Sequence, residues 1–359
     1  MAQAPQEEAQ EEAQEELQDE LQDELRTVLW PEGDGTPTRV VSCRHCGLKN
    51  RIPVPDAVMT PERIDCGGCS GALFLTREEP FEGLSADAYL HGADRRSLNV
   101  LRSVPVVPGL LHSVLRYAGD RPAQLMFLSE AIRCDEEQFP ELVALVDLAR
   151  KRLDFPVKPT VYLGESPHMN ALTTGVEEPV VVVRSSLLDQ MADDELVAIL
   201  GHEFGHLHAS HPLYRTMASV LLRSGGTAWQ PLRLVSLPLH RVFLRWGRAA
   251  ELTADRAGLL ACRSLVTSIR VLLTFAGGNR PGTTDRTKIR MEPFIRQCRE
   301  LAKIESGQGL DGMLAEQLSM DRTHPHVARR VMHLINWVRY GNYLNILSGD
   351  YRRRRPRTY

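Results

Sequence analysis

The chain lacks any apolar run long enough to cross a membrane. Its longest stretch without charged side chains runs only from Ser103 to Leu115 and contains Pro105 and Pro108, whereas a spanning helix needs about 20 apolar residues. A basic, apolar leader is also missing, because residues 1–25 carry ten acidic side chains and no Lys or Arg, the opposite of a secretory signal peptide. Without an export signal, the seven Cys are not expected to form a secreted disulfide framework. We therefore expect a cytoplasmic protein whose thiols are reduced or bound to metal.

A concentrated basic excess, typical of nucleic-acid-binding domains, is missing as well. The formal net charge is -3, and the body between the acidic start and the basic end is close to neutral. Residues 1–25 repeat with a period of four and are interpreted as an acidic low-complexity tail, helical or disordered. Residues 350–359, with five Arg and one Asp, form a basic tail. No nucleic-acid partner is expected.

Four of the Cys form two closely spaced pairs, Cys43-x-x-Cys46 and Cys66-x-x-Cys69, separated by 19 residues. Two-residue gaps let both thiolates of a pair converge on one ion, and two such pairs make a tetrahedral zinc site. The spacing predicts a zinc ribbon over residues 40–76, and the segment resembles the N-terminal zinc ribbon of some bacterial thioredoxins. Because four thiolates leave no open position for a substrate, this module would be structural or would recruit a protein partner.

The rest of the chain shows patterns of helices with a few strands. Two short β-branched or aromatic runs, Thr160–Leu163 and Val180–Val183, are bounded by Gly and Pro and predict strands. Asp193 and Asp194 precede an apolar-periodic segment, which predicts the N-terminus of a helix. The expected fold class is α+β, mainly helical with a small sheet. We divide this part into a linker or helical region and a larger domain, residues 77–118 and 119–345.

The predicted helix contains the motif His-Glu-x-x-His. His202 and His206 are four residues apart, which places them on one helical face about 6 Å apart at Cβ and lets both imidazoles share a zinc ion. Glu203 lies beside them, where it can take a proton from a zinc-bound water and pass it to a leaving amine. The motif alone leaves an alternative open, namely two ordinary surface or core histidines that flank a Glu.

A third ligand is needed to decide between these interpretations. The metzincin spacing requires Gly and His at positions 209 and 212, which hold Ala209 and Pro212 instead, so that subclass is excluded. His208 and His211 follow the motif closely, but neither has the required spacing. Both are interpreted as polar or packing residues.

A Glu on a second helix is the other common source of a third ligand. In the segment A-A-E-L-T-A-D-R-A-G, Glu251 and Asp255 are four residues apart on one face. Glu251 can ligate the metal while Asp255 accepts the second ring N–H of a ligating His and so fixes its tautomer. An exposed acidic pair on an amphipathic helix is the alternative.

Four stretches, in order, resemble the HtpX-like and CAAX prenyl protease type of zinc metallopeptidase, a gluzincin family. They are H-M-N-A-L-T-T-G, H-E-F-G-H, E-L-T-A-D-R-A-G and T-H-P-H-V-A-R-R. The resemblance implies a mainly helical metallopeptidase domain in which Glu203 is the general base. It implies zinc ligands at His202, His206 and Glu251, and catalytic or cleft positions at His324, Arg329 and Asn170.

One departure from the family concerns the membrane. Many of its members are integral membrane proteins, but here the corresponding insert, Leu213–Gly247, is interrupted by five Arg and by Gly and Pro. Such charge density is costly in hydrocarbon. Two interpretations stay open for the insert: a lid over the active site, or peripheral contact with a membrane surface.

Together these features predict a soluble zinc-dependent endopeptidase that hydrolyses peptide bonds of protein or peptide substrates. It would hold two zinc ions, one catalytic and one structural. The rival hypothesis is a non-catalytic zinc-ribbon adaptor that retains a metallopeptidase-like metal site. The intact Glu203 argues against this rival, because a purely structural site needs no general base.

Overall fold

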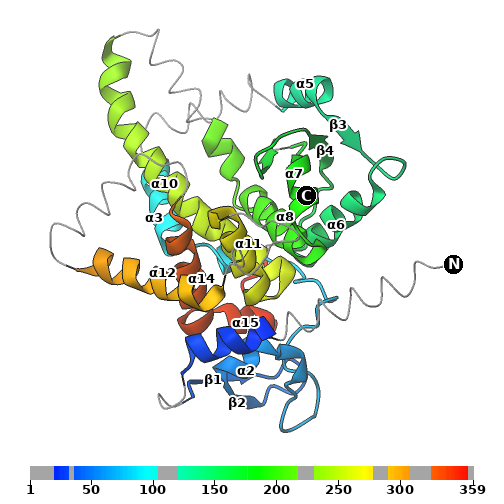
Figure 1. Cartoon of the computed structure of the whole chain (residues 1–359), viewed down its shortest axis with the longest axis vertical. Helices are drawn as coiled ribbons and strands as arrows, with labels where there is room; N and C mark the ends of the chain where they lie inside the picture. Colours follow the sequence, from blue (N-terminus) through cyan, green and yellow to red (C-terminus); the bar gives the residue numbers. More distant parts are fainter. Residues whose placement is uncertain are drawn as a thin grey trace.

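The computed structural model describes residues 20–31, 36–103, 120–175, 177–216, 230–277, 290–307 and 325–354, with side chains of the helix that starts at Gln230 described from residue 242 onward. The described part is mainly helical and contains two small sheets, which confirms the expected α+β class (Figure 1). No helix in this part is both long and apolar enough to span a membrane.

The elements follow one another along the chain as two groups. The N-terminal group comprises β1 (Thr38–Ser42), β2 (Lys49–Pro53), α2 (Val54–Met59), the 3₁₀ turns η1 (Pro61–Arg63) and η2 (Ala86–Ala88), and α3 (Gly92–Ser103). The second group begins with α5 (Arg121–Glu130), β3 (Ile132–Cys134), α6 (Pro140–Arg152), β4 (Thr160–Gly164), β5 (Ala171–Thr174), β6 (Val180–Arg184) and α7 (Ser185–Gln190). It continues with α8 (Asp193–His208), α10 (Gln230–Cys262), α11 (Leu265–Gly277), α12 (Met291–Ser306), α14 (Val327–Tyr340) and α15 (Tyr343–Leu347).

The cysteine-bearing module is built on an antiparallel hairpin of β1 and β2, in which Thr38 pairs with Pro53. It shares one apolar core with the helices near the C-terminus. The backbone N–H of Leu75 donates to the carbonyl of Leu347 at 2.8 Å, which ties the end of the module to α15. The module is therefore packed onto the second group of elements, as Figure 1 shows for β1, β2 and α2 beneath α14 and α15.

Part of the acidic tail is packed as well. Residues 20–29 are helical, and Leu25 and Leu29 in this stretch are buried in the shared core. A Glu24 carboxylate oxygen accepts a 2.8 Å hydrogen bond from the backbone N–H of Glu292, at the start of α12. Residues 1–19 lie outside the described residues.

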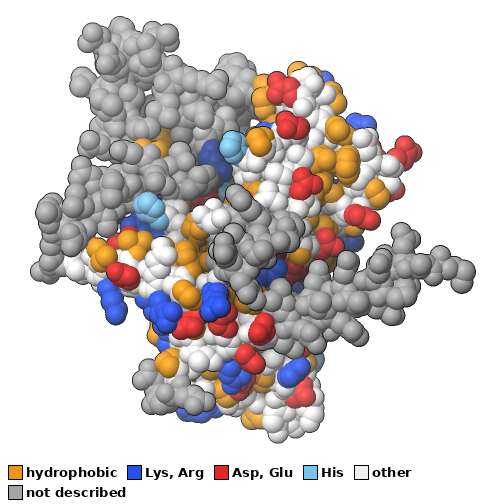
Figure 2. All heavy atoms as spheres, in the orientation of Figure 1, with side chains coloured by type: hydrophobic (Ala, Val, Ile, Leu, Met, Phe, Trp, Pro, Cys, Tyr) orange, Lys and Arg blue, Asp and Glu red, His pale blue; other side chains and the backbone are white. Residues whose placement is uncertain are grey.

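The larger sheet has the strand order β3-β4-β6-β5, with β4 and β6 parallel and both outer pairs antiparallel. Its two central strands contain the runs expected from the sequence, Thr160–Leu163 and Val180–Val183, and these two predictions are confirmed. All four valines of β6 are buried, as continuous β-branched runs in central strands usually are. On the outer side, Figure 2 shows apolar side chains gathered over α5 and β3, where Leu128 is 58% exposed.

The helix predicted from Asp193 is present as α8, and α10 lies beside it (Figure 1). Small residues let the two helices approach closely. A Cβ added at Gly205 would lie 2.6 Å from the Cβ of Ala257, and one added at Gly258 would lie 2.7 Å from the carbonyl oxygen of Ala198. This close contact brings the acidic side chains of α10 to the histidines of α8.

Three expected segments, namely the linker, the insert and the basic tail, lie partly outside the described residues. Residues 104–119, at the end of the expected linker, and residues 217–229, in the expected insert, are among those not described. The linker is helical over α3, and the buried side chain of Asp94 faces α10. In the basic tail, Arg354 forms an ion pair with Asp154 at 2.5 Å.

Candidate metal centres and active site

The histidines of α8 and the first acidic residue of the α10 pair form one cluster. The Nε2 atoms of His202 and His206 lie 3.2 Å apart. Each of these atoms lies 3.4 Å from a carboxylate oxygen of Glu251. His206 and Glu251 are buried, whereas His202 is partly exposed at the floor of a cavity.

These separations fit a zinc ion. Donors bound to zinc at about 2.0–2.1 Å in a tetrahedron lie about 3.3 Å apart, and the donor–donor distances of 3.2 and 3.4 Å match this value. Two imidazole nitrogens and one carboxylate oxygen are also the donor set of a zinc site that keeps one position open. The structure thus brings His202, His206 and Glu251 together in an arrangement that can hold a catalytic metal.

Glu203 lies next to this cluster and is held by the sheet. Its Oε2 accepts a 3.0 Å hydrogen bond from the hydroxyl of Thr173, on β5. Burial raises the pKa of Glu203 above its ordinary value, although His202 and Arg215 act in the opposite direction. A carboxylate with a raised pKa is a better proton acceptor near neutral pH than an exposed one.

Asp255 lies one turn beyond Glu251 on α10 and supports the first histidine. Its Oδ1 lies 3.0 Å from the Nδ1 of His202. Burial disfavours a charged ring at His202, but hydrogen bonds to Asp255 and Glu251 outweigh it and raise the pKa of His202 to about 9. Arg330, on α14, donates to both oxygens of Asp255 at 2.9 and 2.5 Å. This two-point contact holds the carboxylate that in turn orients the ring of His202.

Arg215 contacts the cluster from the other side. Its guanidinium donates to Glu251 at 2.7 Å and lies 3.2 Å from the Nε2 of His206. The pKa of His206 is held well below its ordinary value, first by burial and then by the charge of Arg215. A neutral imidazole is the form that binds a metal, and the lowered pKa keeps the ring of His206 in that form.

The cluster opens into a cavity of about 430 Å³. Its polar lining contains Asn170, the residue expected to border the cleft, together with the metal cluster and Glu203. Its lining also contains six apolar side chains, those of Ala198, Ile199, Leu259, Val271, Leu272 and Phe275. The cavity therefore places an apolar surface directly beside the cluster.

Two other expected site residues are not placed at the cluster. His324 lies outside the described residues. Arg329 pairs with Glu305 of α12 at 2.6 Å, and it is the next residue, Arg330, that lines the cavity. Consecutive residues of a helix point about 100° apart, so only one of two neighbouring arginines can face the cluster.

Sequence reasoning missed several contacts of the cluster. The prediction named Arg329, and the structure places its neighbour Arg330 at the cavity instead. Arg215 and Thr173 do not lie at a sequence spacing typical of metal ligands. His211, interpreted as a packing residue, lies with its Nδ1 2.8 Å from the Nδ1 of His206. The five-residue interval between His206 and His211 could have indicated this contact. No sequence pattern could have indicated the second partner of His211, Asp94, because it comes from α3.

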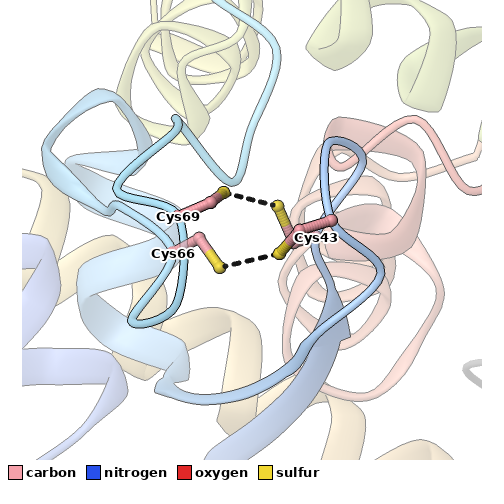
Figure 3. A group of neighbouring side chains, drawn as sticks. Cys43, Cys66 and Cys69 are labelled. Atoms are coloured by element: carbon pink, nitrogen blue, oxygen red, sulfur yellow. Dashed lines mark hydrogen bonds between the residues drawn. The ribbon is translucent and has the colours of Figure 1, made fainter.

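The four expected Cys also form one cluster (Figure 3). The sulfurs of Cys43 and Cys69 lie 3.7 Å apart, and those of Cys46 and Cys66 lie 3.6 Å apart. Thiolates bound to zinc at about 2.3 Å in a tetrahedron lie about 3.8 Å apart. Backbone N–H groups of Gly68 and Cys69 lower the pKa of Cys66 to about 6, which favours the thiolate that a metal requires.

Comparison with known proteins agrees with this arrangement. The sequence model described as Peptidase family M48 matches residues 136–338, more than half of the chain. The chain belongs to peptidase family M48, a metallopeptidase family. The resemblance to HtpX-like and CAAX prenyl protease type enzymes, expected from four motifs, is thereby confirmed.

Individual relatives match over different lengths. The chain is 29% identical over 273 residues to Plastoglobule-localized metallopeptidase 48, chloroplastic, of Arabidopsis thaliana, and the match covers 75% of this chain and 77% of that protein. It is 36% identical over 84 residues to the Protease HtpX homolog of Salinibacter ruber, covering 23% of this chain and 30% of the relative. The crystal structure of S. mikatae Ste24p matches with a TM-score of 0.32 and 17% identity, covering 64% of this chain and 56% of Ste24p.

The cytoplasmic location expected from the sequence is wrong by this comparison. The relative that aligns over three-quarters of the chain is named as plastoglobule-localized and chloroplastic. The expectation depended on the acidic composition of residues 1–25, and that composition does not specify a compartment.

Proposed function

We propose that this chain is a zinc-dependent endopeptidase in which His202, His206 and Glu251 hold the catalytic zinc. The observation that carries the proposal is the convergence of three suitable donor atoms within 4.8 Å of one another, on the floor of a cavity that also contains Glu203. When bound there, zinc would polarise the scissile carbonyl and lower the pKa of an attacking water. A second zinc, in the four-cysteine cluster, would be structural.

The chain's own residues supply the proton transfers. Glu203 accepts a proton from the attacking water at a carboxylate oxygen and then gives it to the leaving amine. Thr173 holds this carboxylate by its 3.0 Å hydrogen bond, which limits its rotation. The apolar side chains that line the cavity receive an apolar part of the substrate and exclude bulk water from the reacting groups.

The alternative is an adaptor that binds zinc but does not hydrolyse peptide bonds. A structural site is normally closed by four protein ligands, whereas this cluster has three and faces a cavity. Glu203 is also buried and desolvated, which costs stability and is typical of residues with a chemical role. Both observations favour catalysis over the adaptor.

The test compares two carboxylates with different proposed roles. Glu203→Gln removes the base but leaves all three ligands, so zinc should stay bound while cleavage of an unfolded protein falls by more than the roughly 10²–10⁴-fold expected for loss of general-base catalysis. Glu251→Ala removes a ligand, so zinc affinity and cleavage should fall together. Glu292→Gln makes the same chemical change at a half-buried position on α12, away from the cluster, and should leave both unchanged.

The outcomes separate the two hypotheses. Excess zinc should partly rescue Glu251→Ala but not Glu203→Gln. If wild type binds zinc at the cluster and cleaves no peptide bond, the adaptor hypothesis is correct. If Glu203→Gln loses its zinc while Glu251→Ala keeps both metal and turnover, the assignment of the third ligand is refuted.

A further inference from the structure

A buried pair of polar residues lies behind the second zinc-binding histidine. His211 and Asp94 are both fully buried. The Nδ1 of His211 lies 2.8 Å from the Nδ1 of His206, and its Nε2 lies 3.0 Å from Asp94 Oδ2. The contacts therefore form a continuous line from a carboxylate on α3 to the ring that faces the proposed metal.

The other contacts of Asp94 show that its carboxylate acts only as an acceptor. The indole N–H of Trp246, which can only donate, contacts Oδ1 at 3.0 Å. The hydroxyl of Thr253 accepts the backbone N–H of His91 at 3.1 Å and directs its own proton to Oδ2 at 2.6 Å. With both oxygens accepting, the group that His211 presents to Asp94 is its Nε2–H.

This assignment fixes the protons along the rest of the line. A neutral imidazole carries one N–H and one lone pair, so a proton on Nε2 of His211 leaves its Nδ1 as an acceptor. That acceptor requires a proton on Nδ1 of His206, and the lone pair of His206 is then on Nε2. The Nε2 atom is the one that lies 3.4 Å from Glu251, within the proposed zinc site.

We propose that Asp94 and His211 are positioning residues that hold His206 in the tautomer and orientation required to bind the catalytic zinc. Partners of this kind typically change metal affinity or activity 10–100-fold when they are removed. The proposal rests on the proposed zinc site, and it assigns a role in that site to α3, which precedes the residues 136–338 matched by the family. His202 has a separate partner, Asp255, so the two histidines are held by different groups.

The first test changes the hydrogen-bond character of the carboxylate and little else. In Asp94→Asn, the amide must point an N–H group either at the indole N–H of Trp246 or at the Nε2 of His211. The second orientation moves the proton of His211 to Nδ1, where it opposes the N–H of His206. We expect the zinc dissociation constant of the cluster, measured by chelator competition, to rise 10–100-fold. Asp87→Asn makes the same chemical change at an exposed position outside this network and is the matched control, with no expected change in zinc affinity.

A second pair of variants tests His211 itself. The amide oxygen of His211→Asn can accept from His206 near the position of Nδ1, whereas His211→Phe offers no acceptor. His211→Asn should therefore retain most of the zinc affinity, and His211→Phe should lose it 10–100-fold. Nitrogen-15 NMR of the histidine rings reports the tautomer of His206 directly, and the zinc of the four-cysteine cluster reports whether each variant is folded.

The readout is metal affinity, so it does not depend on proteolysis. The proposal is overturned if Asp94→Asn and His211→Phe fold and bind zinc within threefold of wild type, or if His211→Asn loses as much affinity as His211→Phe. A wild type that binds zinc at the cluster but cleaves no peptide contradicts the proposed function alone, and the affinity comparison still decides the role of Asp94 and His211.

Discussion

The close contact between α8 and α10 allows a quantitative test of how the site is assembled. A Cβ at Gly205 would lie 2.6 Å from the Cβ of Ala257 and 3.0 Å from the Cα of Ala254, whereas carbon atoms in ordinary contact are about 3.5–4.0 Å apart. In Gly205→Ala the two helices must therefore move apart by about 1 Å. Glu251 lies on one helix and both histidines lie on the other, so this movement also separates the proposed zinc ligands.

Two opposing effects set the expected loss of stability. Overpacking of a well-packed core costs about 1–3 kcal/mol, while replacing Gly by Ala inside a helix gains about 1 kcal/mol. We expect Gly205→Ala to lower the free energy of unfolding by about 0–2 kcal/mol and to weaken zinc binding as well. Gly247→Ala is the matched control on α10, because no described atom lies within 4 Å of its added Cβ. It should be neutral or stabilising by up to about 1 kcal/mol.

A compensating change distinguishes steric conflict from other causes. Ala257→Gly removes the methyl group that a side chain at Gly205 would meet, so the double variant should show a favourable coupling energy of about 1–2 kcal/mol. Urea unfolding followed by circular dichroism, with and without excess zinc, measures the wild type and all four variants. A coupling energy below about 0.5 kcal/mol, or a Gly205→Ala variant as stable as Gly247→Ala, would refute the reasoning.

A fully loaded chain should contain two zinc ions, one per cluster. Mild chelation should remove only the ion outside the four-thiolate site. Metal analysis before and after chelation tests both expectations. Leu25→Ala should lower the free energy of unfolding by about 2–5 kcal/mol, because Leu25 is fully buried. Leu128 is 58% exposed. Leu128→Ala should therefore change the free energy of unfolding by less than about 0.5 kcal/mol in the same urea assay. Arg330→Gln should move acid unfolding to higher pH. Burial disfavours the charged form of Asp255, but the ion pair with Arg330 outweighs this effect and keeps the pKa of Asp255 below its ordinary value. A carboxyl with a depressed pKa stabilises the fold above its unfolded value of about 3.9 and loses this contribution as the pH falls. Without the guanidinium that loss begins at higher pH, and equal acid midpoints for the two proteins would contradict the expectation.

Local periodicity accounts for the parts of the site that sequence could predict. The two histidines of α8, and Glu251 and Asp255 of α10, are each four residues apart on one helix, and helical geometry alone puts such pairs on one face. The Cys pairs are similar, because each two-residue gap makes a turn that directs both sulfurs to one point. In these cases the chemistry depends on neighbours in the sequence.

The contacts that sequence missed join residues far apart in the chain. Asp94 and His211 are separated by 117 residues, and Thr173 and Glu203 by 30. Their partnership is set by how α3 and β5 pack on α8 and α10, and no spacing pattern encodes that packing. Arg330 shows a finer limit, because the dipeptide Arg329-Arg330 contains the correct residue type twice and only the rotation of α14 selects one.

The division of the chain into a linker and a separate catalytic domain has a consequence for the metal site. If Asp94 and His211 orient His206, the catalytic unit includes α3 and therefore starts before residue 119. The same unit extends to α14, whose Arg330 holds Asp255 and through it His202. Each histidine of the proposed zinc site is then fixed by a carboxylate from a different segment, and both carboxylates are buried and hydrogen-bonded. Rigid ligands of this kind reduce the reorganisation needed when metal binds, so the packing of α3 and α14 contributes to metal affinity as well as to stability.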